Sequence, residues 1–182
     1  MGDSVYVVSI AELPAAALLQ RDKLKRPDPA APEYPSPNAW LFQSNPVLYD
    51  LRAALRSLEE QVWSVSRYAS QIREGDRVYL WEAGRCGGIV GIGQIVEPPR
   101  LQPEPPEQQP FARDDELFAR ERIRAKLRIV RIIVPVIARQ TIVSCPPLRM
   151  LDVLRCSRGT NFRLSPEQRS SLDALILGLA TT

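Results

Sequence analysis

The sequence predicts an α+β domain built on a small curled β-barrel or curled sheet with flanking helices. Five apolar segments of strand length occur without regular alternation with helices, and two other segments have helical periodicity. Mixed elements in this order are typical of α+β domains rather than of parallel α/β folds. Hydrophobic residues make up 45% of the 182 residues, which is enough for a buried core without disulfides or metals.

The predicted strands are residues 40–42, 61–65, 78–81, 89–96 and 127–134. Residues 78–81 and 89–96 flank a glycine-containing loop and are expected to pair as a hairpin. Gly91 and Gly93 lie on one face of their strand, which indicates either a tight bend of the sheet or the close approach of a ligand. Pro135 follows the longest apolar segment and predicts a sheet edge or a bulge there.

Two helices are expected, over residues 47–58 and after Ser165. The first segment has leucines three and four apart on one face, the spacing of a helix packed in a core. The second segment begins with Ser165 as N-cap, Pro166 at the first helical position and Gln168 at the third. This is a capping box. The core-facing residues are expected to be Leu48, Leu51, Leu55 and Leu58 in the first helix and Leu172, Leu175, Ile176 and Leu179 in the second.

Prolines divide the chain. Five of the seventeen fall between Pro27 and Pro37, and six fall between Pro98 and Pro110. We therefore expect residues 1–37 to form an N-terminal extension with a proline-rich connection, including a strand near residues 5–10 and a helix near residues 13–20. Residues 38–182 are expected to form one domain with a proline-rich internal loop at residues 97–110.

Composition excludes several classes of enzyme. Histidine is absent, so there is no Ser-His-Asp triad, HNH nuclease site or His-ligated zinc. Cys86, Cys145 and Cys156 form no CxxC pair, and neither a thiolate metal site nor a disulfide framework is expected. No Walker A, GxGxxG or GxSxG motif occurs. The carboxylate run at residues 114–116 is more typical of a solvated face. We therefore predict a protein that is not an enzyme and has no cofactor or metal.

The N-terminus has no basic segment before its short apolar run, and no stretch approaches the roughly 20 apolar residues that span a bilayer. A cytoplasmic protein without membrane contact is expected.

Arginine dominates the basic residues. The net charge is only +3, but all of the 24 basic residues except Lys23, Lys25 and Lys126 are arginine. Arginine pairs with phosphates and stacks on bases, although a GC-rich genome produces the same composition. The candidates for phosphate contacts, with an exposed solubilising face as the alternative, are Arg67, Arg85, Arg120, Arg122 and Arg124.

Two tryptophans lie at predicted strand ends next to small or polar residues. Isolated tryptophans are more often core residues. Trp63 and Trp81 are nevertheless able to sandwich a flat ring, with Ser64 or main-chain groups reading its edge. Purine and pyrimidine rings fit that description.

Five motifs in order resemble the EVE domain. They are WLFQSNP at residues 40–46, VWSVSRY at 62–68, GDRVYLW at 75–81, GIVGIG at 88–93, and RGTNF at 158–162 before Ser165-Pro166-Glu167. The resemblance is closest to EVE modules of modification-dependent restriction systems. It implies the PUA-like fold, a small curled β-barrel with flanking helices, and a relationship to the YTH domains that bind methylated RNA.

The resemblance also implies a pocket for a modified base that is flipped out of a duplex or presented on a single strand. Trp63 and Ser64 match the pair that forms one wall of the aromatic cage in YTH relatives. The further positions expected at the pocket are Trp81 on its border, Ser44 and Asn45 against a base edge, and Thr160 and Asn161 in the segment that closes over or supports it.

Two matched positions depart from many EVE proteins. Gln43-Ser44-Asn45-Pro46 stands where those have Lys-Ser-Glu-Pro, and Arg67-Tyr68 stands where those have Arg-Asn. An amide donates and accepts, whereas a carboxylate only accepts, so the preferred base can differ. Arg67 and Tyr68 remain among the predicted nucleic-acid-binding residues.

The leading hypothesis is a non-catalytic module that recognises a methylated or hydroxymethylated base in DNA, such as 5-methylcytosine, by base flipping. A nuclease, acting as a partner or fused to the module, is the expected context. The alternative is an RNA-binding module of the PUA or ASCH type without selectivity for modified bases. An enzyme acting on modified nucleosides is the third hypothesis, and the missing histidine and carboxylate pair argue against it.

Overall fold

A computed structural model describes residues 38–114, 120–156 and 158–178 of the protein. The strand expected near residues 5–10 and the helix expected near residues 13–20 lie outside these residues. Within the described ranges, no helix has the length and apolar character that a bilayer crossing requires.

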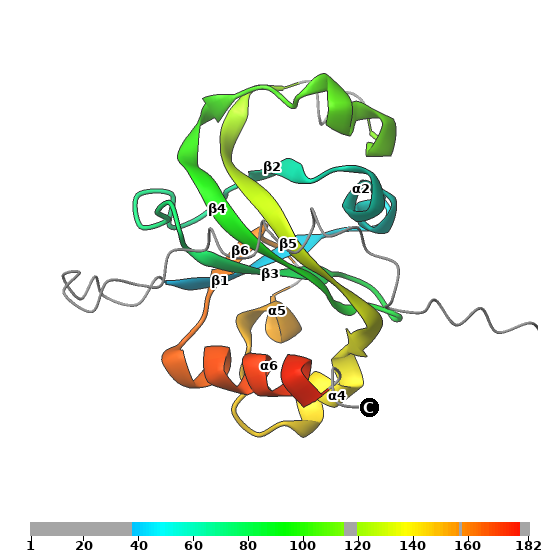
Figure 1. Cartoon of the computed structure of the whole chain (residues 1–182), viewed down its shortest axis with the longest axis vertical. Helices are drawn as coiled ribbons and strands as arrows, with labels where there is room; N and C mark the ends of the chain where they lie inside the picture. Colours follow the sequence, from blue (N-terminus) through cyan, green and yellow to red (C-terminus); the bar gives the residue numbers. More distant parts are fainter. Residues whose placement is uncertain (1–37, 115–119, 157, 179–182) are drawn as a thin grey trace, which may run out of the picture. The chain divides into compact units, whose positions relative to one another are not determined.

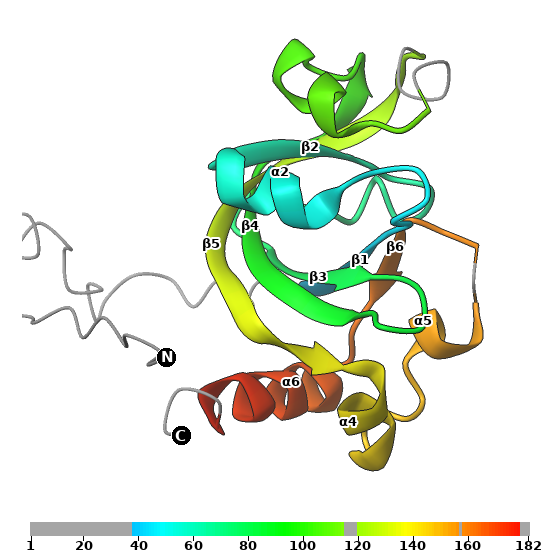
Figure 2. The same cartoon turned by 90° about the vertical axis from the view of Figure 1, so that its right-hand side faces the viewer.

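A six-stranded sheet in the order β2-β5-β4-β3-β1-β6 forms the framework (Figure 1). Neighbouring strands are antiparallel except β1 and β3, which are parallel. The sheet is strongly curled but not closed (Figure 2), so the predicted α+β class is confirmed in its open form. The strands are β1 (Ala39–Ser44), β2 (Glu60–Ser64), β3 (Arg77–Glu82), β4 (Gly88–Gln102), β5 (Arg122–Ala138) and β6 (Asn161–Arg163).

The long pair of β4 and β5 produces the curl. Its register shifts at four places, and two of these shifts adjoin Gly91 and Gly93. A Cβ atom on Gly91 would lie 3.2 Å from the carbonyl oxygen of Arg131, and one on Gly93 would lie 3.0 Å from that of Arg128. Of the two interpretations of this glycine pair, the bend of the sheet is therefore confirmed. The expected hairpin of β3 and β4 is also present.

The prolines mark bulges rather than strand ends. Pro135 lies between the paired residues Ile132 and Ile137, where the register shifts, which confirms the predicted bulge. The segment 97–110 differs from the expected loop, because β4 continues to Gln102 with its two adjacent prolines inside the shift between Glu97 and Arg100. Proline is tolerated there because a bulge needs no ladder N–H. A 3-10 helix, η3 (Pro106–Phe111), follows.

Helix α2 (Leu51–Ser57) begins four residues later than residues 47–58 suggest. The side chain of Asp50 accepts a hydrogen bond from the N–H of Ala53 at 3.1 Å and caps the helix. The preceding residues form a turn in which Leu48 N–H donates to the Asn45 carbonyl at 2.9 Å. This turn takes Leu48 off the helix face. The remaining helices are α4 (Arg139–Ser144), α5 (Asp152–Arg155) and α6 (Pro166–Gly178).

The capping box of α6 is confirmed. Ser165 Oγ accepts from Gln168 N–H at 3.1 Å, and Gln168 Oε1 accepts from Ser165 N–H at 3.0 Å. Leu172 and Ile176 are buried on the predicted face.

Two hydrophobic cores lie on opposite faces of the sheet. Strand side chains alternate between them, because successive residues of a strand point to opposite faces. On β1, Trp40 and Phe42 belong to the core that α2 covers, which we call the α2 core, whereas Leu41 belongs to the core with Leu172 and Ile176, which we call the α6 core.

Asp76 fastens the start of β3 to β1. Its side chain is 2% exposed. It accepts hydrogen bonds from Trp40 Nε1 at 2.7 Å and from the N–H groups of Asn38 and Arg73 at 2.9 Å each. Three donors are thus satisfied by one carboxyl group.

We expect Asp76→Ala to lower the free energy of unfolding by at least about 3 kcal/mol, since each buried donor left without an acceptor costs about 1–3 kcal/mol. Urea unfolding measures this loss. The exposed Asp152 provides the control, and Asp152→Ala is expected to cost under about 1 kcal/mol. Equal losses in the two variants would contradict the role of Asp76.

Candidate functional site

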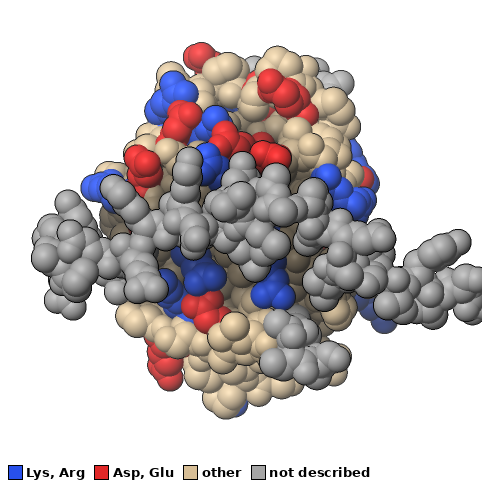
Figure 3. Space-filling model, viewed as in Figure 1, with Lys and Arg blue, Asp and Glu red and all other residues tan. Residues whose placement is uncertain are grey.

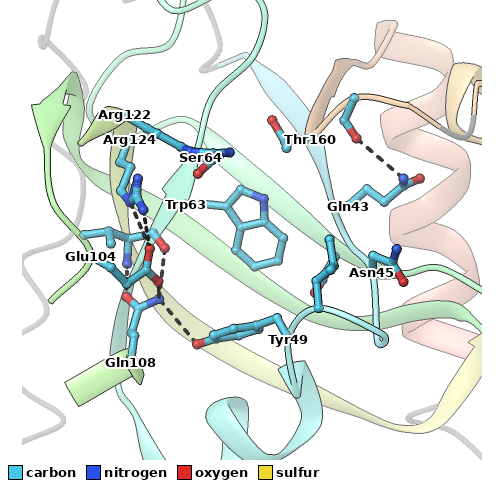
Figure 4. Close-up of a pocket in the computed structure, with 14 residues that line it drawn as sticks. Gln43, Asn45, Tyr49, Trp63, Ser64, Glu104, Gln108, Arg122, Arg124 and Thr160 are labelled. Atoms are coloured by element: carbon cyan, nitrogen blue, oxygen red, sulfur yellow. Dashed lines mark hydrogen bonds and ion pairs between the residues drawn. The ribbon is translucent and has the colours of Figure 1, made fainter. Parts of the chain in front are cut away.

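A cavity of about 280 Å³ opens at the end of β2, on the α2 side of the sheet (Figure 4). Segments far apart in the sequence meet there: the end of β1 and the following turn, β2, the segment around η3, the start of β5 and the residues before β6. The lining residues are Gln43, Ser44, Asn45, Leu48, Tyr49, Val62, Trp63, Ser64, Glu104, Gln108, Arg122, Arg124, Gly159 and Thr160.

Trp63 lies in the middle of this lining (Figure 4). The residue is 8% exposed and packs against Phe42, with ring centroids 5.8 Å apart at an interplanar angle of 42°. Phe42 thus contacts one side of the indole, and the residue also lines the cavity. Tyr49 adds a second aromatic side chain, which packs edge-on against Phe111 at 6.4 Å. Burial raises the pKa of the Tyr49 hydroxyl, which keeps it neutral.

Ser64 presents main-chain groups to the cavity. Val65 N–H donates to the Ile123 carbonyl on the β5 side, and Ile129 N–H donates to the carbonyl of Glu59. Odd-numbered residues of this segment therefore direct their backbone groups toward β5, and even-numbered residues direct theirs away from it. The N–H and C=O of Ser64 consequently point outward beside the Trp63 ring. This is the geometry for reading the edge of a flat ring.

Gln108 meets the same strand edge at Val62. Val62 N–H donates a short hydrogen bond to Gln108 Oε1, and Gln108 Nε2 lies 3.1 Å from the Val62 carbonyl oxygen. The same nitrogen lies 2.8 Å from Glu104 Oε1 and 3.3 Å from the Tyr49 hydroxyl. These buried groups form the polar network drawn with dashed lines in Figure 4.

Glu104 and Arg124 form a buried ion pair within this network. Arg124 Nη2 and Nε lie 2.7 and 2.9 Å from Glu104 Oε2, and the two side chains are 1% and 4% exposed. Arg124 was predicted to contact phosphate, but its guanidinium is paired inside the protein rather than presented at the surface. The ion pair with Glu104 accounts for the burial of this side chain, and a phosphate contact at Arg124 stays a prediction.

Burial raises the pKa of Glu104 to about 7, while the positive charges of Arg124 and Arg122 act in the opposite direction. Desolvation outweighs the attraction, as it often does for buried ion pairs. The site thus contains a carboxyl group that titrates near neutral pH.

Trp81 does not reach the cavity. It is 2% exposed and belongs to the α6 core, on the opposite face of the sheet from Trp63. Strand alternation explains the difference, since Val78 and Leu80 of β3 face the α2 core and Tyr79 and Trp81 face the α6 core. The expectation that Trp81 borders the pocket is not supported.

Asn161 acts as a clamp on the loop after β2. Its side chain is fully buried; Oδ1 accepts from the N–H groups of Ser66 and Arg67 at 3.0 Å each, and Nδ2 donates to the Arg67 carbonyl. It therefore holds the backbone beside the cavity and does not line it. Thr160 does line the cavity, and its hydroxyl accepts from Ser66 N–H at 3.1 Å.

The other predicted residues divide into two groups. Ser44, Asn45 and Arg122 line the cavity together with Trp63, Ser64 and Thr160. Four exposed residues do not line it, namely Arg67, Tyr68, Arg85 and Arg120. Tyr68 has a positive φ of 58°, and its ring packs against that of Trp40 in a tilted arrangement with centroids 5.8 Å apart.

Sequence reasoning missed Tyr49, Glu104 and Gln108. Tyr49 was assigned to a helix, and the other two residues lie in the segment interpreted as a proline-rich loop. Among the described residues there is no cluster of three or more Cys, Asp or Glu side chains suited to a metal ion.

The family of the chain follows from its sequence. The model of the EVE domain matches residues 38–173. This chain belongs to the EVE domain family, and the predicted resemblance is confirmed. No curated protein matches the chain at a significant level.

Solved structures show the same fold at low sequence identity. A protein from Leishmania major has 14% identity and a TM-score of 0.57, with 79% of this chain and 97% of that one covered. A Pseudomonas putida protein has 21% identity and a TM-score of 0.56, covering 75% and 98%. Human THYN1, solved in complex with 5-methylcytosine-containing DNA, has 16% identity and a TM-score of 0.54, covering 76% and 96%.

Because the folded state raises the pKa of Glu104 from 4.5 to about 7, it binds this proton more tightly than the unfolded chain does. The stability from this group is fully present below pH 4.5 and is lost as pH rises through about 7. The chain has no histidine to titrate in the same window.

We therefore expect the parent chain to lose more unfolding free energy than Glu104→Gln between about pH 5 and about pH 8. Urea unfolding of both proteins at the two pH values tests this. Parallel pH dependence of the two proteins would assign the effect to another group.

Proposed function

We propose that this chain binds a modified base of a nucleic acid in the cavity at Trp63 and is not an enzyme. The observation that carries the proposal is the pairing of the Trp63 ring with the outward main-chain groups of Ser64 in one cavity. An aromatic face stacks on any base, and an adjacent donor and acceptor read its edge. The related THYN1 was solved with 5-methylcytosine-containing DNA, which supports a modified base as the ligand.

Polar side chains around the ring give the base edge further partners. Asn45 and Thr160 lie on one side of Trp63, across from the Glu104 network (Figure 4), and Ser44 also lines the cavity. Asn45 Oδ1 already accepts from Val47 N–H at 3.0 Å, which orients its amide. Serine, threonine and asparagine both donate and accept, so they suit the mixed edge of a base.

Base flipping fits the energetics of this site. Removing a base from a duplex costs a few kcal/mol, and one aromatic platform returns about 1–3 kcal/mol. Phosphate contacts must supply the difference. Arg122 is the predicted phosphate contact that lies in the cavity lining without being buried in an ion pair. Arg67, Arg85 and Arg120 are exposed and remain proposed contacts for flanking phosphates.

DNA with a methylated or hydroxymethylated base is the preferred ligand in this proposal. A methyl group changes the shape of the base, and burying it contributes only about 0.8 kcal/mol to binding. The selectivity for the methylated over the unmodified base is therefore expected to be modest. The restriction-system resemblance supports a nuclease partner or fused nuclease, and the cytoplasm as the location.

An unselective RNA-binding module is the second candidate, and the charge distribution argues against it. On the face in Figure 3, basic and acidic side chains are interleaved. Lys126 and Arg128 pair with Glu60 at 2.7 and 2.9 Å, and Arg100 pairs with Glu97 at 2.9 Å. Paired charges attract a phosphate backbone less than a free basic stripe does.

Loss of the aromatic platform tests the proposal. We expect Trp63→Leu to weaken binding to the preferred modified oligonucleotide by about 5- to 150-fold, the equivalent of 1–3 kcal/mol. Fluorescence anisotropy measures this with DNA and RNA oligonucleotides carrying cytosine, 5-methylcytosine, 5-hydroxymethylcytosine, adenine or N6-methyladenine. Trp81→Phe is the matched control and should bind as the parent does. The proposal fails if a folded Trp63→Leu, checked by circular dichroism, retains parental affinity.

A phosphate contact at Arg122 predicts a different signature. Arg122→Gln should weaken binding to every oligonucleotide by a similar factor and make the slope of log K against log salt shallower by about 0.7–0.9. Arg131 lies further along β5, is exposed and does not line the cavity, so Arg131→Gln should leave the slope unchanged. Titrations between about 50 and 200 mM salt compare the variants. An unchanged slope in Arg122→Gln would remove this residue from the interface.

A further inference from the structure

Strand β2 is the terminal strand of the sheet, with β5 as its neighbour on one side. Its even-numbered residues direct N–H and C=O groups away from β5, as derived above. Such an edge is normally satisfied by water or by another strand. At Val62, two residues before Ser64, both outward groups are instead bound by one side chain, that of Gln108.

A primary amide is suited to this task. It carries an N–H donor beside a C=O acceptor, the same pair that a peptide group of a neighbouring strand would offer. Gln108 therefore replaces one residue of a missing strand. A carboxylate has no donor and an aliphatic side chain has neither group, so the amide is the side chain that this edge requires.

Gln108 is itself held on both sides. It is 3% exposed, and its nitrogen lies 2.8 Å from Glu104 Oε1. Glu104 is bound in turn by Arg124 at 2.7 Å, and Arg124 stands opposite Ser64 in the register of β5 and β2. The contacts from Val62 through Gln108 and Glu104 thus end at Arg124, the register partner of Ser64. Trp63 lies between Val62 and Ser64 on β2, and its ring and neighbouring main chain form the proposed base-reading surface.

We propose that Gln108 is the positioning residue for base recognition. It fixes the edge of β2 and so sets the position of the Trp63 backbone and the direction of the Ser64 main-chain groups. This inference rests on the proposed function. Gln108 acts through the strand, with no contact to the base required, and Glu104 and Arg124 act by holding Gln108.

The first test compares Gln108→Met with Gln109→Met. Gln109 is the adjacent glutamine of η3 and is exposed, so its replacement controls for the loss of an amide from this helix. Losing both strand contacts should weaken binding to the tightest-bound oligonucleotide of the panel by at least about tenfold. It should also reduce the preference over the unmodified counterpart and accelerate hydrogen exchange at the Val62 amide. Gln109→Met should change none of these.

A second variant separates positioning from a loss of folding. Gln108→Glu keeps the side-chain size, and a protonated carboxyl again offers one donor and one acceptor. Its affinity relative to the parent at the same pH should recover as pH falls. The groups facing this position are Glu104, Arg122, Arg124 and Tyr49, and the parent measured at each pH accounts for their titration.

Parental affinity and parental Val62 exchange in a folded Gln108→Met would overturn the inference. So would a Gln108→Glu variant whose relative affinity is independent of pH. If the parent chain itself prefers no modified oligonucleotide, the proposed function fails, and Val62 exchange alone then decides whether Gln108 holds the strand.

Discussion

The pairing of β4 with β5 is the interaction on which the rest of the structure depends. These strands run the length of the domain, and bulges between them turn the sheet through a sharp curl. The glycines at two of these bulges allow the strands to approach where a Cβ atom would crowd the opposite backbone. One end of β5 carries β2 and the buried Arg124, and the other leads into α4. The curled pair of β4 and β5 thus determines the positions of the cavity and of both cores.

Local patterns predicted much of the fold and part of the site. Apolar runs located five of the six described strands but not the short β6, and the Ser165 capping box located α6. Both signals come from neighbouring residues. Trp63 and Ser64 were identified through a motif. The role of Gln108 was not predicted, because its partner Val62 is 46 residues away in the sequence. No periodicity in the sequence indicates a contact between residues so far apart. Trp81 was misplaced because alternation shows that residues share a face without showing which core that face meets.

The buried polar network of Gln108, Glu104 and Arg124 contains a carboxyl group with a raised pKa, which the amino-acid composition does not reveal. The chain has no histidine, and burial beside the cavity raises the pKa of the Glu104 carboxyl group to about 7. Its pairing with Arg124 fixes geometry more than it adds stability, as expected where desolvation offsets attraction. A polar cluster of this kind specifies a single arrangement of β2 because each member has few alternative partners.

The two cores lie on opposite faces of the sheet, and this arrangement has a practical consequence for handling the protein. Helix α6 belongs to the core on the opposite face of the sheet from Trp63, and its outer surface includes Leu177, which is 65% exposed. A linker or fluorophore attached at this position sits away from the cavity at Trp63. Immobilisation on a sensor surface through α6 therefore leaves the mouth of the cavity unobstructed, whereas attachment through the turn after β1 would obstruct it.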